Sequence, residues 1–559
     1  MLPPPPPRPA RPPASAGAAP AVGAVPSAAH AALAGLVAGL VAIAAGELFV
    51  GLVAGAPSIV VAVGDLVIAL QPPGAKDLVV GLFGGNHKVA LQVAVVIAAL
   101  AIAAGAGVLA RRRFDRGAWA FVVAGGFALV VSLAVGGGSA DPLVALATVG
   151  VAVGAGLVTL RWLLTLAARA AAAKAEDAPP AAARSETARD AATATNEEAA
   201  TPASWARRRF LIASAATVGG AAVAGLVGRD LVERRAAEEV VIASRLPAPL
   251  QPAPLIEGDQ ELAVGGITPL VLPNDAFFRI DTALVIPRVD LDTWRLAVRG
   301  MVDRPFELTY DELLELPLVE QHVTIACVSN PVGGHLVGNA RWTGVRLREL
   351  LEMAGVQDGA TQVVGRSVDG FTAGFPTSWA LDPGREALVA VAMNGEPLPA
   401  KHGFPARRVV PGLYGYVSAT KWLSAIELTT REAVDGFWIP LGWAKDAPIL
   451  TQSRIDVPRT GARLAAGPVD VAGVAWAPDR GVAGVEVRVD DGPWQAARMA
   501  RPISGATWVQ WAFAWDATPG DHRVEVRAID GTGEVQTDRE TDPAPDGARG
   551  HHRITVSVD

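Results

Sequence analysis

The single cysteine of this 559-residue chain, Cys327, stands where a strand-like run meets a turn-rich segment. Residues 322–326 are rich in β-branched side chains, which favours a strand. Glycine, asparagine and proline are frequent in the residues that follow, and these types favour tight turns. The run 345–354 has helical periodicity. The thiol is therefore predicted to lie at a strand end beside a loop, where functional side chains are often found.

Three roles are open to such a thiol. It could be a small buried apolar residue. It could be a nucleophile, with His322 or His335 as its base. It could also be a metal ligand, because thiolates bind soft metals. One thiolate is too few for structural zinc, which takes four protein ligands, but it is enough where a cofactor brings its own sulfurs.

Apolar residues are unevenly distributed along the chain. The mean hydropathy is +0.33, 51% of the residues are hydrophobic and only 18% are charged. The apolar excess lies before residue 230, which indicates a membrane half followed by a soluble half. The net charge of −7 gives no support for nucleic-acid binding.

Five apolar segments in the first half are predicted to cross a membrane, because each is long enough to span about 30 Å of hydrocarbon as a helix. Two further apolar runs are too short to span and are predicted to lie outside the membrane or at its interface. The predicted spans are residues 31–53, 89–110, 118–138, 143–160 and 207–229, and the short runs are 58–70 and 77–83.

Basic residues predict how these spans are oriented. Arginines follow the second span at 111–113 and 116, and Arg207, Arg208 and Arg209 precede the fifth. Basic clusters favour the cytoplasmic side. This places the N-terminus in the cytoplasm and residues after 230 outside it, so we expect a multi-pass cell-membrane protein in contact with lipid. The segment 207–211 also resembles a twin-arginine export signal, which agrees with that placement.

Histidine positions bear on whether the membrane half carries haem. Only His30 and His87 precede residue 230, and both fall at span ends. A bis-histidine haem needs facing pairs within the spans, so no haem is predicted there and the helices are predicted to be an anchor.

Composition then predicts the order of domains. Mixed strand and helix patterns fill one region, and alternating runs separated by Gly-Pro and Asp-Gly turns fill the last, which is typical of a β-sandwich. The predicted order is a disordered Pro/Ala-rich tail (1–28), a four-helix membrane bundle (29–170), a cytoplasmic linker (171–206), a fifth transmembrane helix (207–229), a second linker (230–265), a mixed α+β catalytic domain (266–458) and a β-sandwich (459–559).

Within the soluble half, strands are predicted at 294–298 and 362–364, and short helices at 310–315 and 347–353. The alternating runs of the last domain are 485–489, 507–514 and 523–529.

The segment around Cys327 resembles the cysteine loop of the sulfite oxidase family of molybdopterin enzymes. Other segments resemble that family in the same order, and several ordered motifs are more specific than one alone. These segments are NDAFFRIDTAL (274–284), DGFTAGFP (369–376), AMNGEPLPAKHGFPARRVVPG (392–412) and KWLSAIEL (421–428). The resemblance extends over residues 255–559.

This resemblance implies a molybdenum–molybdopterin cofactor whose metal is bound by the Cys327 sulfur and two pterin sulfurs. It also implies which other residues contact the cofactor. The residues alone leave alternatives open. Arg279 could be a surface arginine, Asp369 could start a turn, and His402 could be a buried structural histidine. Arg407 and Arg408 could also exchange roles. The implied contacts are Asn274, Phe278, Arg279, Asp369, His402, Arg407 and Lys421; Asp281 stands where sulfite oxidases carry a histidine.

The family also has an immunoglobulin-like dimerisation domain after the catalytic one, so the resemblance implies this fold for 459–559 and a possible homodimer. The soluble half has no C-x-x-C-H haem motif. Electrons are therefore expected to pass to or from a separate partner protein.

The sequence departs from sulfite oxidases where those enzymes hold their anionic substrate. Residues 328–332 contain no cation, and Tyr414 and Tyr416 occupy the loop after Pro411. Arg341 and Arg346 come later and could fold back. A small dianion would be poorly paired in such a site, so a neutral or organic substrate is expected. Tyr414 is predicted to be catalytic with Cys327, either donating a hydrogen bond to an oxygen ligand of the metal or forming an aromatic wall.

These observations predict a membrane-anchored, extracytoplasmic oxidoreductase that transfers oxygen atoms in two-electron steps, with a small-molecule substrate other than sulfite. Alternatives within the superfamily are a sulfite dehydrogenase or a sulfoxide reductase. A different class is a non-catalytic membrane protein whose soluble half is a degenerate cofactor-binding module.

Overall fold

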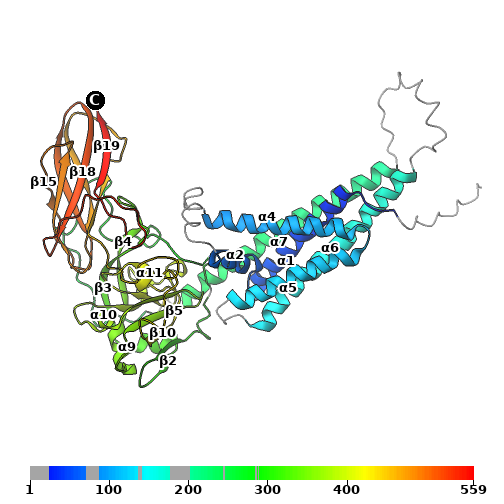
Figure 1. The fold of residues 1–559 in the computed structure, drawn as a ribbon, viewed down its shortest axis with the longest axis horizontal. Coiled ribbons are helices and arrows are strands. Elements are labelled where there is room, and N and C mark those ends of the chain that lie inside the picture. The colour runs from blue at the N-terminus through cyan, green and yellow to red at the C-terminus, as the bar shows by residue number, and fades with distance from the viewer. Residues whose placement is uncertain are drawn as a thin grey trace, which may run out of the picture. The chain divides into compact units, whose positions relative to one another are not determined.

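The computed structural model describes residues 24–53, 55–70, 87–135, 141–176, 202–242, 246–283, 286–287 and 289–559. The chain forms two compact units. One comprises residues 1–63, 89–132 and 141–231, and the other comprises 64–88, 133–140 and 232–559. Helices make up the described part of the first unit, and strands dominate the second (Figure 1).

The first unit is built from long apolar helices. In the described residues, five helices are long and apolar enough to cross a membrane. Each predicted span overlaps one of them, whereas α2 (Ile59–Ala69) is too short, as predicted. The predicted run 77–83 lies outside the described residues. The five are α1 (Ala28–Leu52), α4 (His87–Ala110), α5 (Phe114–Val135), α6 (Pro142–Glu176) and α7 (Pro202–Ile242).

Two of these helices extend into segments predicted to be linkers. α6 continues to Glu176, and α7 begins at Pro202 and continues to Ile242. The linker predictions for 171–206 and 230–265 were therefore wrong at residues 171–176, 202–206 and 230–242. Alanine, glutamate, lysine and arginine are frequent there, and these residues have high helix propensity even without an apolar face to bury.

Glycines allow α1 and α4 to approach closely. A Cβ on Gly35 would lie 2.1 Å from the carbonyl oxygen of Ala103, and a Cβ on Gly107 would lie 2.1 Å from that of Ala31. The two glycines are thus reciprocal contacts of one crossing. Small residues at helix crossings let backbones pack without side chains between them, as is common in membrane proteins.

The part of the second unit predicted to be the catalytic domain, residues 266–458, contains two sheets, and we call this part the catalytic region. The first has strand order β2-β1-β10-β5-β6, and the second has order β3-β4-β7-β8 with β9 also paired to β7. Their bounds are β1 (Leu296–Gly300), β2 (Phe306–Leu308), β3 (Leu318–Ala326), β4 (Val337–Arg346), β5 (Gln362–Ser367), β6 (Thr372–Pro376), β7 (Leu388–Met393), β8 (Glu396–Pro397), β9 (Arg407–Val409) and β10 (Leu423–Thr429).

Short helices connect these strands. A capping box between Thr309 and Glu312 starts the first of them, and Gly355 with φ of 69° ends the second. The helices predicted at 310–315 and 347–353 are confirmed, but residues 345 and 346 belong to a strand. The helices are α8 (Tyr310–Glu315), α9 (Leu347–Ala354), α10 (Thr377–Leu381), the 3₁₀ turn η3 (Ala400–His402) and α11 (Gly415–Ser418).

The C-terminal region consists of two further sheets, ordered β11-β13-β17-β16 and β12-β19-β18-β14-β15, which share one apolar core. The three alternating runs predicted as strands lie in or overlap β14, β17 and β18. The bounds are β11 (Gln452–Val457), β12 (Arg463–Leu464), β13 (Gly467–Trp476), β14 (Val482–Val489), β15 (Gln495–Ala496), β16 (Arg498–Met499), β17 (Val509–Ala517), β18 (Gly520–Asp530) and β19 (His552–Val558).

Buried hydrogen bonds join this region to the catalytic sheets. The backbone N–H of Trp508 donates to Thr324 Oγ1 at 2.8 Å, and its indole N–H donates to the carbonyl of Leu270 at 2.7 Å. Trp508 is fully buried. Because Thr324 lies on β3, the C-terminal region is tied to the strand that ends at Cys327.

The reciprocal glycine contact can be tested with two substitutions on one helix. Gly107→Val should destabilise the helical unit by about 1–3 kcal/mol, because the added side chain meets the α1 backbone. Gly105→Val is the matched control, since a Cβ there meets nothing within 4 Å. Thermal unfolding of detergent-purified protein, followed by far-ultraviolet circular dichroism, compares them. Equal unfolding midpoints for the two variants would contradict the packing.

Candidate active site

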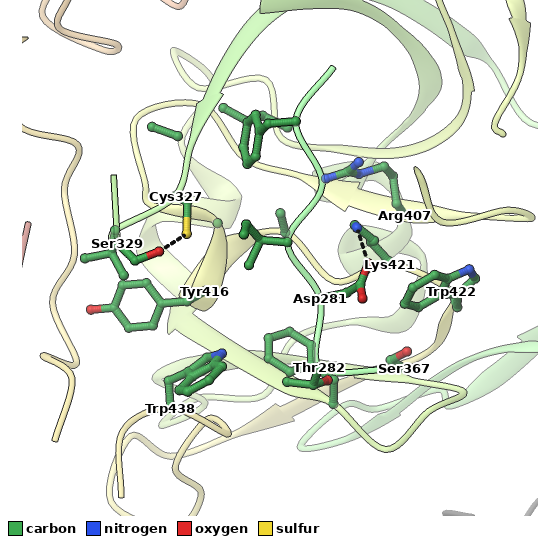
Figure 2. A pocket seen from close by; sticks show the side chains of 18 of the residues that line it. Asp281, Thr282, Cys327, Ser329, Ser367, Arg407, Tyr416, Lys421, Trp422 and Trp438 are labelled. Carbon is green, nitrogen blue, oxygen red and sulfur yellow. Dashed lines mark hydrogen bonds and ion pairs between the residues drawn. The ribbon is translucent and has the colours of Figure 1, made fainter. Parts of the chain in front are cut away.

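Cys327 lines a cavity in the catalytic region, between the end of β3 and the segment that follows β9 (Figure 2). One side of the cavity carries Cys327, Ser329, Tyr416 and Trp438, and the other carries charged side chains. The full lining is Phe277, Phe278, Ile280, Asp281, Thr282, Ile325, Ala326, Cys327, Val328, Ser329, Ser367, Asp369, Phe371, Arg407, Gly415, Tyr416, Ala419, Lys421, Trp422, Trp438 and Trp443.

The loop that carries the thiol is held by its own hydrogen bonds. The N–H of Cys327 donates to the carbonyl of Leu336 at 2.8 Å, and the carbonyl of Cys327 accepts from Asn330 N–H at 3.1 Å. Asn330 Oδ1 accepts from Leu336 N–H at 2.8 Å. Ser329 Oγ lies 3.0 Å from the Cys327 sulfur. The turn residues predicted after the cysteine thus fix the direction of its side chain.

The nucleophile–base alternative has no geometric support. Neither His322 nor His335 is among the residues that line the cavity. His322 pairs with Arg341 across β3 and β4, four residues before the strand ends, and burial lowers the pKa of its imidazole. A general base must be within hydrogen-bond reach of the group it deprotonates.

Asp281 joins two predicted cofactor contacts. Its Oδ2 accepts from Arg279 Nε at 2.8 Å and from Lys421 Nζ at 3.1 Å. The Asp281 side chain is 4% exposed and Lys421 10%, whereas Arg279 is 35% exposed. Burial lowers the pKa of Lys421 to about 8, and Asp281 opposes that shift. Asp281 and Lys421 line the cavity, but Arg279 lies behind them.

Arg407 is a buried cation with an unused donor. Its guanidinium lies over the ring of Trp342, 4.7 Å from the centroid, and its Nη1 donates to the carbonyl of His402 at 3.0 Å. Its Nε is buried and has no hydrogen-bond partner. Burial lowers the pKa of Arg407 to about 10. An unsatisfied buried donor beside a cavity is a place where a ligand acceptor compensates the lost hydration.

Arg408 does not exchange roles with Arg407. Because successive side chains of a strand point to opposite faces, it faces away from its neighbour's side. Its guanidinium is fully buried and donates to four backbone carbonyls, those of Ser418, Val363, Ala373 and Val417. It is a structural arginine, and Arg407 alone of the two lines the cavity.

Asn274 and His402 lie behind the lining and support it. His402 Nε2 donates to the carbonyl of Asn274 at 2.6 Å, and burial lowers the pKa of His402 to about 3, so the ring is neutral. The Asn274 amide is held by Asn394 and the carbonyl of Met393. His402 Nδ1 is buried without a partner.

Phe278 and Asp369 line the cavity directly. Asp369 Oδ1 accepts from Phe371 N–H at 3.1 Å, so the carboxyl also stabilises the turn that follows it. Burial raises the pKa of Asp369, with its hydrogen bonds and Lys421 opposing the shift.

Tyr414 is not among the residues that line the cavity, and its catalytic role stays a prediction. It precedes α11, and its hydroxyl lies 3.4 Å from the N–H of Leu450, on the side of the C-terminal region. Tyr416 lines the cavity instead, and its hydroxyl donates to the carbonyl of Ala444. The two side chains point in different directions because the helical turn α11 begins at Gly415, between them.

Sequence reasoning missed Trp438 and Trp443, which line the cavity beside Tyr416. The rings of Tyr416 and Trp443 are 5.9 Å apart. The sequence signal that could have identified them is the cluster of aromatic residues at 437–443. Their spacing matches neither the period of a strand nor that of a helix. We call Tyr416, Trp438 and Trp443 the aromatic wall.

The residues of this site fit a ligand that has a soft metal at one end and an anionic group at the other. Cys327 lines the cavity at one side, and Arg407, which has an unused buried donor, and Lys421 line it at the other (Figure 2). Thiolate suits a soft metal, and a guanidinium suits phosphate.

Comparisons with known proteins find relatives of this chain. A family model described as the oxidoreductase molybdopterin binding domain matches residues 283–438. Human mitochondrial sulfite oxidase is 32% identical over 315 residues, which cover 48% of this chain and 57% of that protein. The chain thus spans little more than half the length of that relative. A solved structure, the sulfane dehydrogenase SoxCD from Paracoccus pantotrophus, is 22% identical with a TM-score of 0.46 and covers 52% of this chain and 82% of that one.

Two relatives are matched over more of their own length. Sulfite oxidase of Gallus gallus is 30% identical over 313 residues, covering 48% of this chain and 68% of that protein. The uncharacterized oxidoreductase YuiH of Bacillus subtilis is 39% identical over 149 residues, covering 27% of this chain and 71% of that protein. This chain is an oxidoreductase that belongs to the sulfite oxidase family of molybdopterin-binding enzymes.

Proposed function

We propose that this protein is a membrane-anchored oxidoreductase whose catalytic region lies outside the cytoplasm and acts on a small neutral substrate. The observation that carries the proposal is one cavity that brings the Cys327 thiol together with the buried cations Arg407 and Lys421. Family membership supports a molybdenum–molybdopterin cofactor in this cavity. When bound, that cofactor supplies two-electron oxygen-atom-transfer chemistry.

In this proposal each predicted residue has a defined part in holding the cofactor. The Cys327 sulfur binds the metal, and Arg407 Nε and Lys421 Nζ bind the phosphate. Phe278 and Asp369 contact the cofactor from the cavity wall. Three residues act one layer further out: Arg279 holds Asp281, while Asn274 and His402 support the carbonyl that accepts from Arg407.

A neutral substrate is supported by where the cations lie. Arg407 and Lys421 are the cations among the lining residues, and both lie on the side away from Ser329 and Tyr416 (Figure 2). Arg341 and Arg346, which could have folded back, pair instead with Glu320 and Glu386. An anion beside Cys327 would lack the charge-assisted hydrogen bonds that normally compensate desolvation.

Two substitutions test the cofactor assignment. We expect Cys327→Ser to abolish activity, and Arg407→Gln to lower molybdenum and pterin content about tenfold because a buried charged contact is lost. Arg304→Gln is the matched control, since Arg304 is exposed and its side chain donates only to the carbonyl of Glu352 in the described structure. Elemental analysis and pterin fluorescence of purified protein give the result. Full activity in Cys327→Ser would show that Cys327 is not a metal ligand. Absence of molybdenum and of activity in the wild type would favour the non-catalytic alternative.

Sulfite should be a poor substrate. A missing charged contact in a buried site costs about 2–5 kcal/mol, or more than tenfold in specificity. Steady-state assays with ferricyanide as acceptor measure kcat/KM for sulfite, and assays with reduced benzyl viologen measure it for neutral alkyl and aryl sulfoxides. A value for sulfite on the order of 10⁶ M⁻¹s⁻¹ would show that the protein is a sulfite dehydrogenase.

Membrane anchoring is supported by the five long apolar helices. Many of their large apolar side chains are exposed, among them Val93, Ile97, Val123 and Leu226, which suits contact with lipid. We further propose that the C-terminal sheets form an immunoglobulin-like dimerisation domain, because two packed sheets with one shared core occupy that region. Electrons pass between the cofactor and a separate partner protein.

Reporter fusions test the orientation. The basic clusters predict that residue 140 lies outside the cytoplasm and residue 190 inside it. A fusion of alkaline phosphatase should therefore be active at residue 140 and inactive at residue 190, and a fluorescent cytoplasmic reporter should show the opposite. The same behaviour at both positions would refute the proposed topology.

A further inference from the structure

Two members of the aromatic wall are carried by a segment without regular structure, so contacts with other parts of the chain must hold that segment in place. Trp438 and Trp443 belong to the stretch between β10 and β11, which forms no helix or strand. Tyr416 contacts this stretch through its hydroxyl, which donates to the carbonyl of Ala444. The N–H of Ala444 provides a second attachment.

That attachment comes from the C-terminal region. The N–H of Ala444 donates to the carbonyl of Pro545 at 3.0 Å. Pro545 lies in a turn closed by the hydrogen bond from Gly547 N–H to the carbonyl of Pro543, at 2.7 Å. We call residues 543–547 the C-terminal turn. One residue, Ala444, thus links the aromatic wall to a turn about 100 residues away in sequence.

The C-terminal turn is itself fixed from two sides. Arg549 forms a bidentate pair with Asp546, with distances of 2.9 and 2.7 Å, and Thr541 and Arg549 bond through their backbones. On the inner side, Gly547 packs against Tyr414. Gly547 has φ of 115°, and a Cβ there would lie 2.6 Å from the Tyr414 hydroxyl oxygen and 3.1 Å from its ring.

We propose that the C-terminal turn is a positioning element of the active site, which sets the place of the aromatic wall and so the substrates that the cavity accepts. This rests on the proposed function, in which the wall faces the substrate. In this proposal Tyr414 is a positioning residue: Gly547 packs against its buried ring, and this contact fixes the place of the turn. It also gives the C-terminal sheets a part in specificity.

Two matched glycine substitutions test the proposal. Gly547→Ala forces the turn away from Tyr414, because the new Cβ meets a buried ring and the backbone conformation is one that favours glycine. Gly533→Ala is the control, since Gly533 also has positive φ, 88°, in the same region but meets nothing within 4 Å. Both variants place a side chain at positive φ, but only Gly547→Ala meets another residue, so a difference between them reports the contact with Tyr414.

Hydrogen–deuterium exchange of the purified full chain provides the first measurement. The Ala444 amide should exchange on the order of tenfold faster in Gly547→Ala, because its acceptor at Pro545 moves, and at the wild-type rate in Gly533→Ala. Asp546→Asn loosens the turn without a steric clash and should show a smaller increase. It serves as the test if Gly547→Ala does not fold. Unchanged exchange at Ala444 in these variants would overturn the proposal.

Kinetics provide the second measurement, with methyl phenyl sulfoxide as the probe and reduced benzyl viologen as the electron donor. Gly547→Ala should raise KM about tenfold with kcat and molybdenum content within about twofold of wild type, since the wall and not the metal ligand moves. Faster exchange with unchanged KM would refute the role in specificity. If the wild type does not reduce the probe, it is not an aryl sulfoxide reductase, and the exchange result still decides whether the turn holds the wall.

Discussion

The buried guanidinium of Arg408 is the interaction on which the active-site geometry depends. A buried charge is tolerated only when its donors are satisfied, and Arg408 donates to the carbonyls of Val363 on β5, Ala373 on β6, and Val417 and Ser418 on α11. One side chain therefore ties β9 to a different sheet and to the helical turn that carries Tyr416. Its neighbour on β9 points the other way and reaches the cavity. Losing one of the carbonyl contacts would displace Tyr416 and Arg407 together.

Ordered motifs made part of this site predictable from sequence. Cys327, Arg407 and Lys421 each lie within a short run that resembles a family motif, so their types and spacing carry the information, and all three line the cavity. Tyr414 and Tyr416 could not be separated in this way. Which of them faces the cavity depends on where α11 begins, and a boundary error of one residue reverses the answer.

Other features could not be predicted because tertiary contacts decide them. Trp438 and Trp443 belong to a segment without periodicity, and hydrogen bonds to Pro545 and Tyr416 place it. The apolar helices were predictable because length and composition suffice to recognise them. Their ends were not, since α7 continues to Ile242 through a segment that mixes charged and apolar residues of high helix propensity, which length and hydropathy do not delimit.

The charges around the cavity support the proposed neutral substrate. Arg279, Lys421 and Arg407 carry three positive charges, and the carboxylates of Asp281 and Asp369 offset two of them when both are ionised. A phosphate monoester carries about −1.5 to −2 at neutral pH, so the phosphate of the proposed cofactor would match the remaining positive charge. No positive charge among the lining residues then remains for the substrate. Beside Cys327 stand the hydroxyl of Ser329 and the aromatic wall, which suit an uncharged molecule with an apolar substituent.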